Sequence, residues 1–475
     1  MNEKYDYDAV IIGAGISGLV CGCYLAKAGL KTLIVEKNYK PGGYCCSYVR
    51  DGYYFKPGVH ALGALRPGGS LNKILSDLGV LSDLVLTRHD PSYIIKTPEF
   101  DFNIYNSIDS TIDEFCRCFP REKDNIRAFL KYIVSAELNS LLKFRSLNFE
   151  QLLNKYFFDK RLKTVISLFI LGFSGLPPWQ VPSIVGCFIL RDFVFDGGYC
   201  PSKGMQDFPD TLLRRFKELK GETIFCKRAT KIICDGKRAV GITLQDGRDI
   251  FSKYVISACD ARQTFIEFIQ NKLDKGFENK FRKYIPSTSL FIVLLGLDKP
   301  IGLSSSNYGS EIILINTLDI KKIYSAMLRF QNNCLLSSFL SLPGDSVPDK
   351  ISVRLGVNTI YRDHDYWKNG GAEKLSFRMI NMAEKIFPGL GKSINYKFIA
   401  TPVTFEAWTG NYQGAAYGWA SIFDQIGNPD ISQRAPVENL YLTGHWVNKS
   451  SGISAVSVCG FDTAKMIIKN MESQK

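Results

Sequence analysis

The first residues in the chain that could do chemistry are three glycines with the spacing G-x-G-x-x-G, namely Gly13, Gly15 and Gly18. In a dinucleotide site the first glycine allows a tight turn, the second lets the backbone approach a pyrophosphate, and the third allows close helix–strand packing. Glu36 follows 18 residues after the last glycine, and its carboxylate can accept hydrogen bonds from both ribose hydroxyls. The pattern predicts a dinucleotide-binding site.

The elements around these residues support that interpretation. Residues 7–12 predict a buried strand, residues 19–28 predict a helix rich in small residues, and residues 33–36 predict a second strand. The helix would begin at the glycines and offer free N–H groups and a partial positive charge to phosphates. Strand, motif, helix, second strand and acid occur in the required order, which favours a dinucleotide site over an isolated glycine turn.

Two further segments favour FAD over NAD as the cofactor. The glycine pair Gly42-Gly43 follows soon after the second strand, where a plain NAD site has no such pair. Near the other end of the chain, residues 439–444 predict a strand and turn, and residues 451–467 predict a helix of small residues. A cofactor site built from both ends of the chain is typical of FAD enzymes. Because a second G-x-G-x-x-G is absent from the sequence, we expect no separate NAD(P)H domain.

Composition disfavours several other classes of protein. A chain of 475 residues is too long for one small core and predicts two joined domains. The 59 basic and 46 acidic residues give a net charge of +13, but the basic residues are scattered, so we expect no nucleic-acid partner. Four histidines and 13 irregularly spaced cysteines without C-x-x-C disfavour a metal site. The start of the sequence lacks a signal-peptide pattern, so we expect reduced thiols and a cytoplasmic location.

The sequence resembles the flavin amine oxidase superfamily, and within it the branch of phytoene desaturases, carotenoid isomerases and retinol saturases. Besides the glycine motifs, the stretches 52–60, 197–206 and 439–456 carry this resemblance. The first of them, GYYFKPGVH, is similar to the G-hydrophobic-x-F-D-x-G-x-H run of the saturases, with a lysine in place of the aspartate. Tyr44 stands where amine oxidases usually have an arginine, and His445 stands where an acid often follows the glycine.

The resemblance implies which residues bind FAD. In the family, the block that corresponds to residues 205–260 lies beside the adenosine half of the cofactor. The expected cofactor-binding residues are Gly13, Gly15, Ile16, Ser17, Gly18, Glu36, Lys37, Gly42, Gly43, Tyr44, Gly58, Val59, His60, Ala229, Thr230, Gly444, His445, Gly452, Ile453 and Ser454.

Two residues are candidates for a role in catalysis. His60 lies in the run that passes near the isoalloxazine in the family, where it could move a proton or orient the flavin; a structural histidine at a turn is the alternative. Tyr417 lies in a glycine-spaced run and could touch flavin or substrate; core packing is the alternative. A flavin exchanges hydride without a protein nucleophile, so the protein has mainly to exclude water and hold the substrate.

Residues 164–190 form a long stretch without charge. Its length could cross a bilayer, but Pro177, Pro178 and Pro182 interrupt it. The alternatives are a pair of core helices, or an apolar lid that touches one leaflet at the mouth of a substrate tunnel. The basic residues at 160–163 would suit anionic headgroups, so we expect peripheral contact with the inner face of a membrane.

These patterns together predict an α/β protein with two domains. A discontinuous Rossmann-type FAD-binding domain would comprise residues 1–85, 200–265 and 430–475. A mixed α+β substrate-binding domain would comprise residues 86–199 and 266–429.

The expected function is that of an FAD-dependent oxidoreductase that desaturates or saturates carbon–carbon bonds of a hydrophobic isoprenoid or other polyene. One alternative is a redox-neutral cis-trans isomerase that uses reduced FAD, and another is a flavin amine oxidase. Oxygen, a quinone or a separate reductase would serve as the electron partner.

Overall fold

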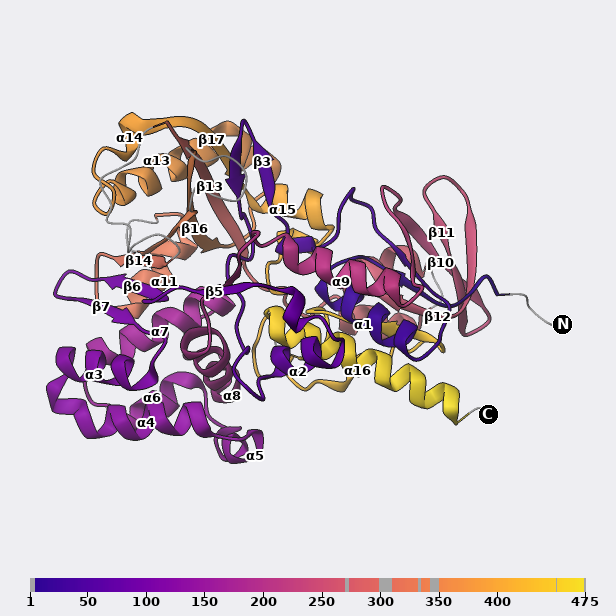
Figure 1. Ribbon diagram of the computed structural model, residues 1–475, viewed down its shortest axis with the longest axis horizontal. Coiled ribbons are helices and arrows are strands. Elements are labelled where there is room, and N and C mark those ends of the chain that lie inside the picture. The colour runs from indigo at the N-terminus through magenta and orange to yellow at the C-terminus, as the bar shows by residue number, and fades with distance from the viewer. Residues whose placement is uncertain are drawn as a thin grey trace.

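The structure is a computed structural model that describes residues 5–269, 273–298, 310–331, 335–341, 350–449 and 451–473. Its two large sheets lie toward opposite ends of the molecule, and each has its own helices (Figure 1). Both ends of the chain lie on the side of the first sheet. All strands of the first large sheet lie in the residue ranges predicted to bind FAD. All strands of the second lie in the ranges predicted to bind substrate.

The first sheet has the order β10-β11-β12-β1-β2-β9, with β18 beside β12. β1 is parallel to both β2 and β12, as a βαβ unit requires, whereas β10, β11 and β12 form an antiparallel meander. The strands are β1 (Tyr7–Ile12), β2 (Thr32–Val35), β9 (Glu222–Ile224), β10 (Ala229–Asp235), β11 (Arg238–Leu244), β12 (Asp249–Ser257) and β18 (Leu440–Leu442).

Helices α1 (Ile16–Lys27), α9 (Asp207–Glu218) and α16 (Ile453–Glu472) pack together beside this sheet. The small residues allow a close approach between the first and last helices, because a Cβ on Gly460 would lie 2.5 Å from the carbonyl oxygen of Ser17. α1 begins earlier than the predicted residue 19, directly at the glycine motif, and α16 runs beyond the predicted end at residue 467. The two ends of the sequence therefore share one core.

The second sheet has the order β17-β13-β16-β15-β14-β6-β7. Helix α13 (Ala372–Ala383) packs against one of its faces, and the opposite face carries Ile292 and Leu294, which pack with residues of the β3–β4 hairpin. Its strands are β6 (Tyr93–Lys96), β7 (Asp101–Ile104), β13 (Ser289–Leu297), β14 (Glu311–Ile315), β15 (Leu335–Ser341), β16 (Ile351–Thr359) and β17 (Ile394–Ala400). The hairpin is a separate two-stranded sheet of β3 (Tyr48–Arg50) and β4 (Tyr53–Phe55).

A block of helices covers the end of the second sheet near β6 and β7 (Figure 1). It comprises α3 (Ile108–Cys118), α4 (Lys123–Ser135), α6 (Phe149–Tyr156), α7 (Lys160–Ser174), α8 (Ser183–Phe188) and a π-helix (Ile189–Phe195). The uncharged stretch 164–190 falls inside this block, and its side chains belong to the largest hydrophobic core of the molecule.

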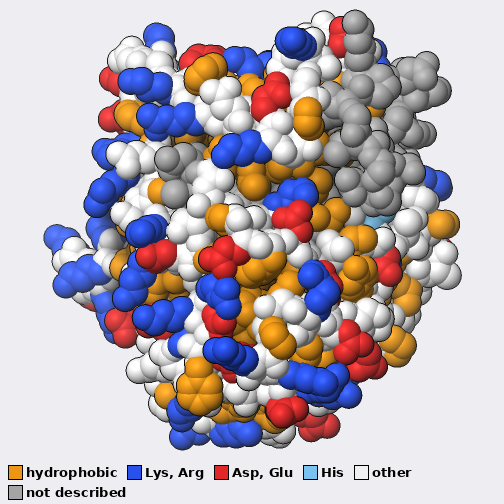
Figure 2. All heavy atoms as spheres, turned by 90° about the vertical axis from the view of Figure 1, so that its left-hand side faces the viewer, with side chains coloured by type: hydrophobic (Ala, Val, Ile, Leu, Met, Phe, Trp, Pro, Cys, Tyr) orange, Lys and Arg blue, Asp and Glu red, His pale blue; other side chains and the backbone are white. Residues whose placement is uncertain are grey.

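The burial of this stretch favours the alternative of core helices over an apolar lid that touches a membrane. Phe169 is only 2% exposed and packs edge-on against the buried ring of Tyr93, and Phe173 is half-buried. On the face shown in Figure 2, outside its grey atoms, hydrophobic side chains are interspersed with charged ones. Among the described residues, none of the helices combines the length and apolar character that crossing a membrane requires. An apolar stretch without charge is buried either in lipid or in a protein core, and here other parts of the protein cover it.

Candidate cofactor and substrate site

A large cavity lies at the carboxyl end of β1, and the space between its walls, open solvent included, is about 1230 Å³. Its walls come from the N-terminal βαβ unit, the β9–β10 connection, the segment 409–417 and the C-terminal segment 444–456. The lining residues are Ile12, Gly13, Gly15, Ile16, Ser17, Val35, Glu36, Lys37, Asn38, Gly42, Gly43, Tyr44, Cys45, Val59, Lys227, Arg228, Ala229, Ala258, Cys259, Gln263, Phe268, Thr409, Asn411, Ala416, Tyr417, Gly444, His445, Gly452, Ile453 and Val456.

The glycine motif forms a narrow backbone cradle at one wall of the cavity. Gly13 has a φ of +107°, which only glycine adopts readily, and a Cβ on Gly18 would lie 2.2 Å from the Gly13 carbonyl oxygen. By contrast, a Cβ on Gly15 would meet no protein atom within 4 Å. The Gly42 N–H donates to the carbonyl of Ala14 at 2.9 Å, which joins the glycine pair to the motif. Gly15 thus faces empty space of the kind that a pyrophosphate would fill.

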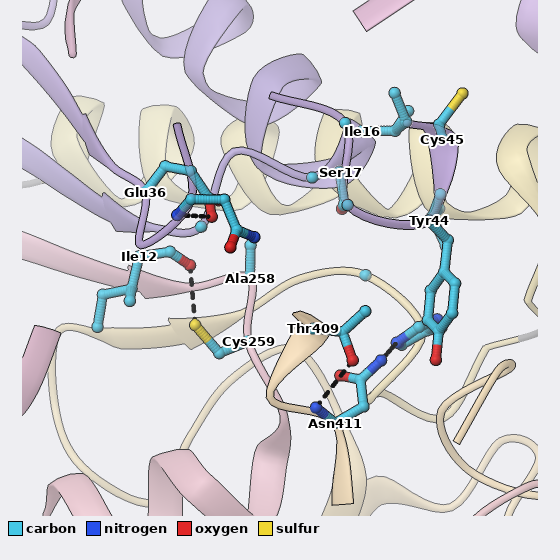
Figure 3. A pocket seen from close by; sticks show the side chains of 18 of the residues that line it. Ile12, Ile16, Ser17, Glu36, Tyr44, Cys45, Ala258, Cys259, Thr409 and Asn411 are labelled. Atoms are coloured by element: carbon cyan, nitrogen blue, oxygen red, sulfur yellow. Dashed lines mark hydrogen bonds between the residues drawn. The ribbon is translucent and has the colours of Figure 1, made fainter. Parts of the chain in front are cut away.

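Glu36 stands at the end of β2 with its carboxylate directed into the same cavity (Figure 3). Its Oε2 accepts the Ala14 N–H at 2.7 Å, and its Oε1 accepts the Asn38 N–H at 2.8 Å. Burial raises the pKa of Glu36, while these backbone donors favour the charged form. Each oxygen keeps a lone pair, so the carboxylate can still accept the two hydroxyls of a ribose.

The C-terminal segment closes the cavity from the other side. The hydroxyl oxygens of Ser17 and Thr443 lie 2.6 Å apart, which joins α1 to the segment that follows β18. α16 begins at Ile453 and points its N-terminus at the cavity, where the free N–H groups can stabilise negative charge. A Cβ on Gly452 would lie 2.5 Å from the ring of Phe193, so the substrate domain reaches this segment.

Most of the residues that the sequence marks as cofactor-binding line this one cavity. They are Gly13, Gly15, Ile16, Ser17, Glu36, Lys37, Gly42, Gly43, Tyr44, Val59, Ala229, Gly444, His445, Gly452 and Ile453. Tyr417, expected to touch flavin or substrate, lines it as well.

Five of the expected residues are not in the lining. Gly18 packs against the Gly13 backbone, and Gly58 lines a neighbouring cavity. Thr230 is exposed and its hydroxyl donates to the Thr243 carbonyl at 3.2 Å, because alternate residues of β10 point to opposite faces. Ser454 is buried at 3% exposure in the first turn of α16. His60 turns toward the second sheet, as described below.

Several lining residues were not among the expected site residues, although Asn411 lies in the same glycine-spaced run as Tyr417. Thr409 is the last residue of α15 (Pro402–Thr409), Asn411 follows two residues later, and Figure 3 places both opposite Glu36. The Asn411 amide Nδ2 lies 3.3 Å from Nε2 of His445. Burial lowers the pKa of His445 to about 4, so this imidazole is neutral at physiological pH. Lys227, Arg228, Cys259 and Gln263 also line the cavity, and no motif marks them.

His60 forms a hydrogen bond with a residue of the second sheet. Its Nε2 lies 2.9 Å from Oε2 of Glu311 on β14, and the Ser337 hydroxyl donates to the other oxygen of that carboxylate. Burial alone would raise the pKa of Glu311, but His60, Ser337 and the nearby Arg354 together lower it to about 2. The carboxylate is therefore ionised, and it orients the imidazole away from the cofactor cavity.

Tyr417 connects the cofactor cavity to the second sheet and to α7. Its phenol oxygen lies 2.9 Å from the Gly172 carbonyl and 3.1 Å from Oδ1 of Asn358 on β16. The Asn358 amide in turn donates to the carbonyls of Leu171 and Gly172 at 3.0 Å. Burial raises the pKa of Tyr417, so the phenol stays protonated and acts as a hydrogen-bond donor.

A second cavity of about 860 Å³ adjoins the first at Gly43 and Tyr44. It lies between the β3–β4 hairpin, α15 and the face of β13 and β17, and aromatic and aliphatic side chains dominate its walls. Its lining residues are Gly43, Tyr44, Cys46, Tyr48, Arg50, Phe55, Pro57, Gly58, Leu294, Tyr396, Phe398, Ala400, Thr404, Phe405 and Trp408. Such a wall suits an apolar ligand.

The donor set fits a dinucleotide. Gly15 leaves room for phosphates, Glu36 can accept ribose hydroxyls, and α16 presents N–H groups. Within the described ranges, no group of three or more His, Cys, Asp or Glu side chains could hold a metal ion. A Rossmann-type sheet with this cavity, beside a second sheet with an apolar cavity, is the arrangement of a flavoprotein oxidoreductase.

The comparisons with known proteins agree with that class. The family model of the flavin containing amine oxidoreductases matches residues 16–456, and the chain belongs to this family. It is 25% identical to the chloroplastic prolycopene isomerase of Arabidopsis thaliana, over 99% of this chain and 84% of that protein. It is 24% identical to the all-trans-retinol 13,14-reductase of Danio rerio, over 92% of this chain and 82% of that protein.

Solved structures show the same fold. An oxidoreductase from Methanosarcina mazei superposes with a TM-score of 0.66 at 15% identity, covering 96% of this chain and 99% of that one. A putrescine oxidase superposes with a TM-score of 0.65 at 16% identity, covering 98% and 99% of the two chains. The predicted α/β fold with a Rossmann-type domain and the predicted membership of the flavin amine oxidase superfamily are confirmed.

Proposed function

We propose that this protein is an FAD-dependent oxidoreductase that desaturates or saturates carbon–carbon bonds of a polyene. The observation that carries the proposal is the apolar cavity that adjoins the cofactor cavity at Tyr44. Aromatic walls can hold a conjugated chain and exclude water from it. The names of two relatives, a prolycopene isomerase and a retinol reductase, point to polyene substrates of those proteins.

FAD is the proposed cofactor, and we expect it to bind without a covalent link. When bound, a flavin supplies hydride exchange at carbon. The chain contributes the cradle at Gly15, the carboxylate of Glu36 and the N-terminus of α16, which bind and orient the cofactor. Cys45 lines the cavity, but neither it nor His445 lies in a sequence pattern known to us for covalent attachment.

Tyr417 and His60 have different proposed roles. Tyr417 lines the cofactor cavity, and its hydrogen bond to the second sheet holds its ring in one orientation, so we assign it to positioning of the substrate. His60 is bonded to Glu311 outside the cofactor lining, and we assign it to the polar end of the substrate region. Proton transfer by His60 stays a prediction.

A redox-neutral isomerase is the second candidate, because the similarity to the prolycopene isomerase covers nearly the whole chain. An amine oxidase is less favoured, since Tyr44 replaces the usual arginine and lines the apolar cavity. The test is incubation of the FAD-loaded protein with a cis-polyene and with all-trans-retinol, under oxidising and reducing conditions. A product that differs by the mass of two hydrogen atoms supports redox chemistry. An isomer of unchanged mass supports isomerisation, and peroxide release with amines alone would overturn both.

The electron partner and the cellular site stay predictions. Oxygen, a quinone or a separate reductase would accept or donate electrons. The net charge of +13 still favours contact with an anionic membrane surface, but through a part of the protein other than residues 164–190.

A further inference from the structure

The face of the second sheet that looks toward the cofactor domain carries a charged side chain among apolar ones. Arg354, Gly356 and Asn358 share this face of β16 because alternate residues of a strand point the same way. In the neighbouring strand β13, their register partners include Leu294, which pairs with Arg354, and Ile292, which pairs with Gly356. Both of these belong to the apolar cluster below the β3–β4 hairpin.

The guanidinium of Arg354 lies along the sheet toward the cofactor domain. A Cβ on Gly356 would lie 2.8 Å from Nη1, so the side chain crosses directly over this glycine. The next residue on the face is Asn358, which bonds to Tyr417 in the cofactor cavity. The glycine in the middle of a buried strand is explained by the arginine that covers it.

Arg354 is buried, and few hydrogen-bond acceptors surround its guanidinium. Only 8% of the residue is exposed, and burial lowers the pKa of the guanidinium. Its Nε donates to the Pro57 carbonyl at 3.1 Å, and the described part of the chain supplies no other hydrogen bond to it. A buried guanidinium with unused donors is costly unless something else accepts them.

The carboxylate of Glu311 does not fill that role. It stands on the same face, but its two oxygens already accept from His60 and Ser337. Within the ranges that the structure describes, no ion pair of 4 Å or less joins Glu311 to Arg354, although the two charges are near enough to shift each other's pKa. Glu311 therefore leaves the guanidinium donors available for a further anion.

We propose that Arg354 binds a carboxylate at one end of an otherwise apolar substrate, an inference that rests on the proposed function. The planar fork of a guanidinium matches the two oxygens of a carboxylate. Pro57 and Leu294, the two residues that hold and flank Arg354, both line the apolar cavity. Arg354 itself lies behind these two residues and outside the lining, so the acidic end of a chain in that cavity would pass between them to reach the guanidinium. The substrate class is that of polyene acids.

Direct binding to the FAD-loaded protein tests this subsite. The probes are all-trans-retinoic acid, its methyl ester and all-trans-retinol, which share one chain and differ in the end group. Fluorescence quenching gives each dissociation constant. We expect the acid to bind about tenfold to a hundredfold more tightly than the ester, because a charge-assisted hydrogen bond exceeds a neutral one.

Variants assign the preference to Arg354. Arg354→Met should reduce the acid-to-ester ratio to near one, and Arg354→Lys should keep part of it. Arg248→Met is the matched control, because Arg248 is 57% exposed and lies in the hairpin between β11 and β12 of the other domain. Gly356→Ala, whose Cβ would press on Nη1, should lower the ratio without removing the charge. The absorbance of bound flavin verifies that each variant is folded.

Two results would overturn the subsite. One is equal affinity for acid and ester in the unaltered protein, which requires no variant. The other is an unchanged preference in a flavin-loaded Arg354→Met protein. Conversion of retinol together with equal binding of acid and ester would reject the subsite and leave the proposed function standing. An acid preference that depends on Arg354, without conversion of any polyene, would establish the subsite and reject the function.

Discussion

The phenol oxygen of Tyr417 lies 3.1 Å from Oδ1 of Asn358, and this contact joins the cofactor cavity to the middle of the second sheet. The same phenol oxygen is 2.9 Å from the Gly172 carbonyl at the end of α7. Its single hydrogen can serve only one acceptor at a time, so the tyrosine links three separate elements through alternative hydrogen bonds. The orientation of its ring is consequently fixed by the substrate domain.

Tyr417→Phe should retain FAD but turn over a polyene roughly tenfold more slowly, because a ring without this anchor positions the substrate less well. Loss of the donor also leaves Oδ1 of the buried Asn358 with one partner fewer, at a cost of about 1–3 kcal/mol in stability. Steady-state kinetics and the flavin spectrum give the two readouts. An unchanged kcat would show that Tyr417 is only core packing.

Gly15→Val should yield apoprotein. No protein atom lies within 4 Å of a Cβ at this position, and the backbone there is extended, so the chain itself can accommodate the change. The added methyl groups would instead occupy the space for the pyrophosphate. Gly172→Ala is the control, since its Cβ also meets no atom within 4 Å but lies far along the chain from the glycine motif.

The bound flavin should not be covalently linked. Acid precipitation should release the flavin of the unaltered protein into the supernatant, and flavin that stays in the pellet would reveal a covalent link.

Phe169→Ser should destabilise the fold by at least about 3 kcal/mol, because the buried ring packs against Tyr93 in the main core. Phe173→Ser should cost less, since that ring is half-buried. Thermal unfolding measures both effects. A Phe169→Ser protein with an unchanged melting temperature and weaker binding to anionic liposomes would instead support membrane contact by residues 164–190.

The pH dependence of stability should contain a contribution from His445. Its pKa falls from 6.5 to about 4 on folding, so the unfolded chain binds more protons between these values. The free energy of unfolding should therefore decrease as the pH falls from about 6.5 to about 4, by roughly 3 kcal/mol from this group. His445→Gln removes the titration, so the stability difference between the two proteins should vary with pH in this window. A difference that is constant with pH would refute the assignment.

NADPH alone should not bleach the bound flavin rapidly. The only G-x-G-x-x-G of the sequence lies in the cavity proposed for FAD, and no second fingerprint is present. Anaerobic stopped-flow spectroscopy with NADPH, and with dithionite as the positive control, measures the rate. Reduction by NADPH as fast as turnover would contradict this prediction.

The cofactor half of the site was predictable because its signals are local in sequence. Gly15 and Glu36 belong to one βαβ unit. The C-terminal segment is recognisable from its own glycines, Gly444 and Gly452. The substrate half was not predictable in this way. Glu311 and Arg354 share one face because β15 stands between β14 and β16, and Phe339 on β15 is the register partner of both residues. No spacing in the sequence encodes those pairings.

The apolar stretch 164–190 illustrates a different limit. Periodicity and charge identify an apolar helix, but they do not say whether lipid or protein covers it. The covering side chains come from remote strands such as β6 and β14, which pack on α7 in the same core. Thr230 was expected in the cofactor site but does not line the cavity. It follows Ala229 on a strand, and neighbouring residues of a strand point to opposite faces.

The contact between Ser17 and Thr443 has a consequence for synthesis of the protein. Ribosomes add about 5–20 residues per second, so the last wall of the cavity emerges tens of seconds after the first. During that interval the nascent βαβ unit has neither β18 at the edge of its sheet nor α16 against α1. Flavin should thus bind only after the segment that contains Thr443 has left the ribosome. Nascent chains stalled before residue 440 should remain colourless.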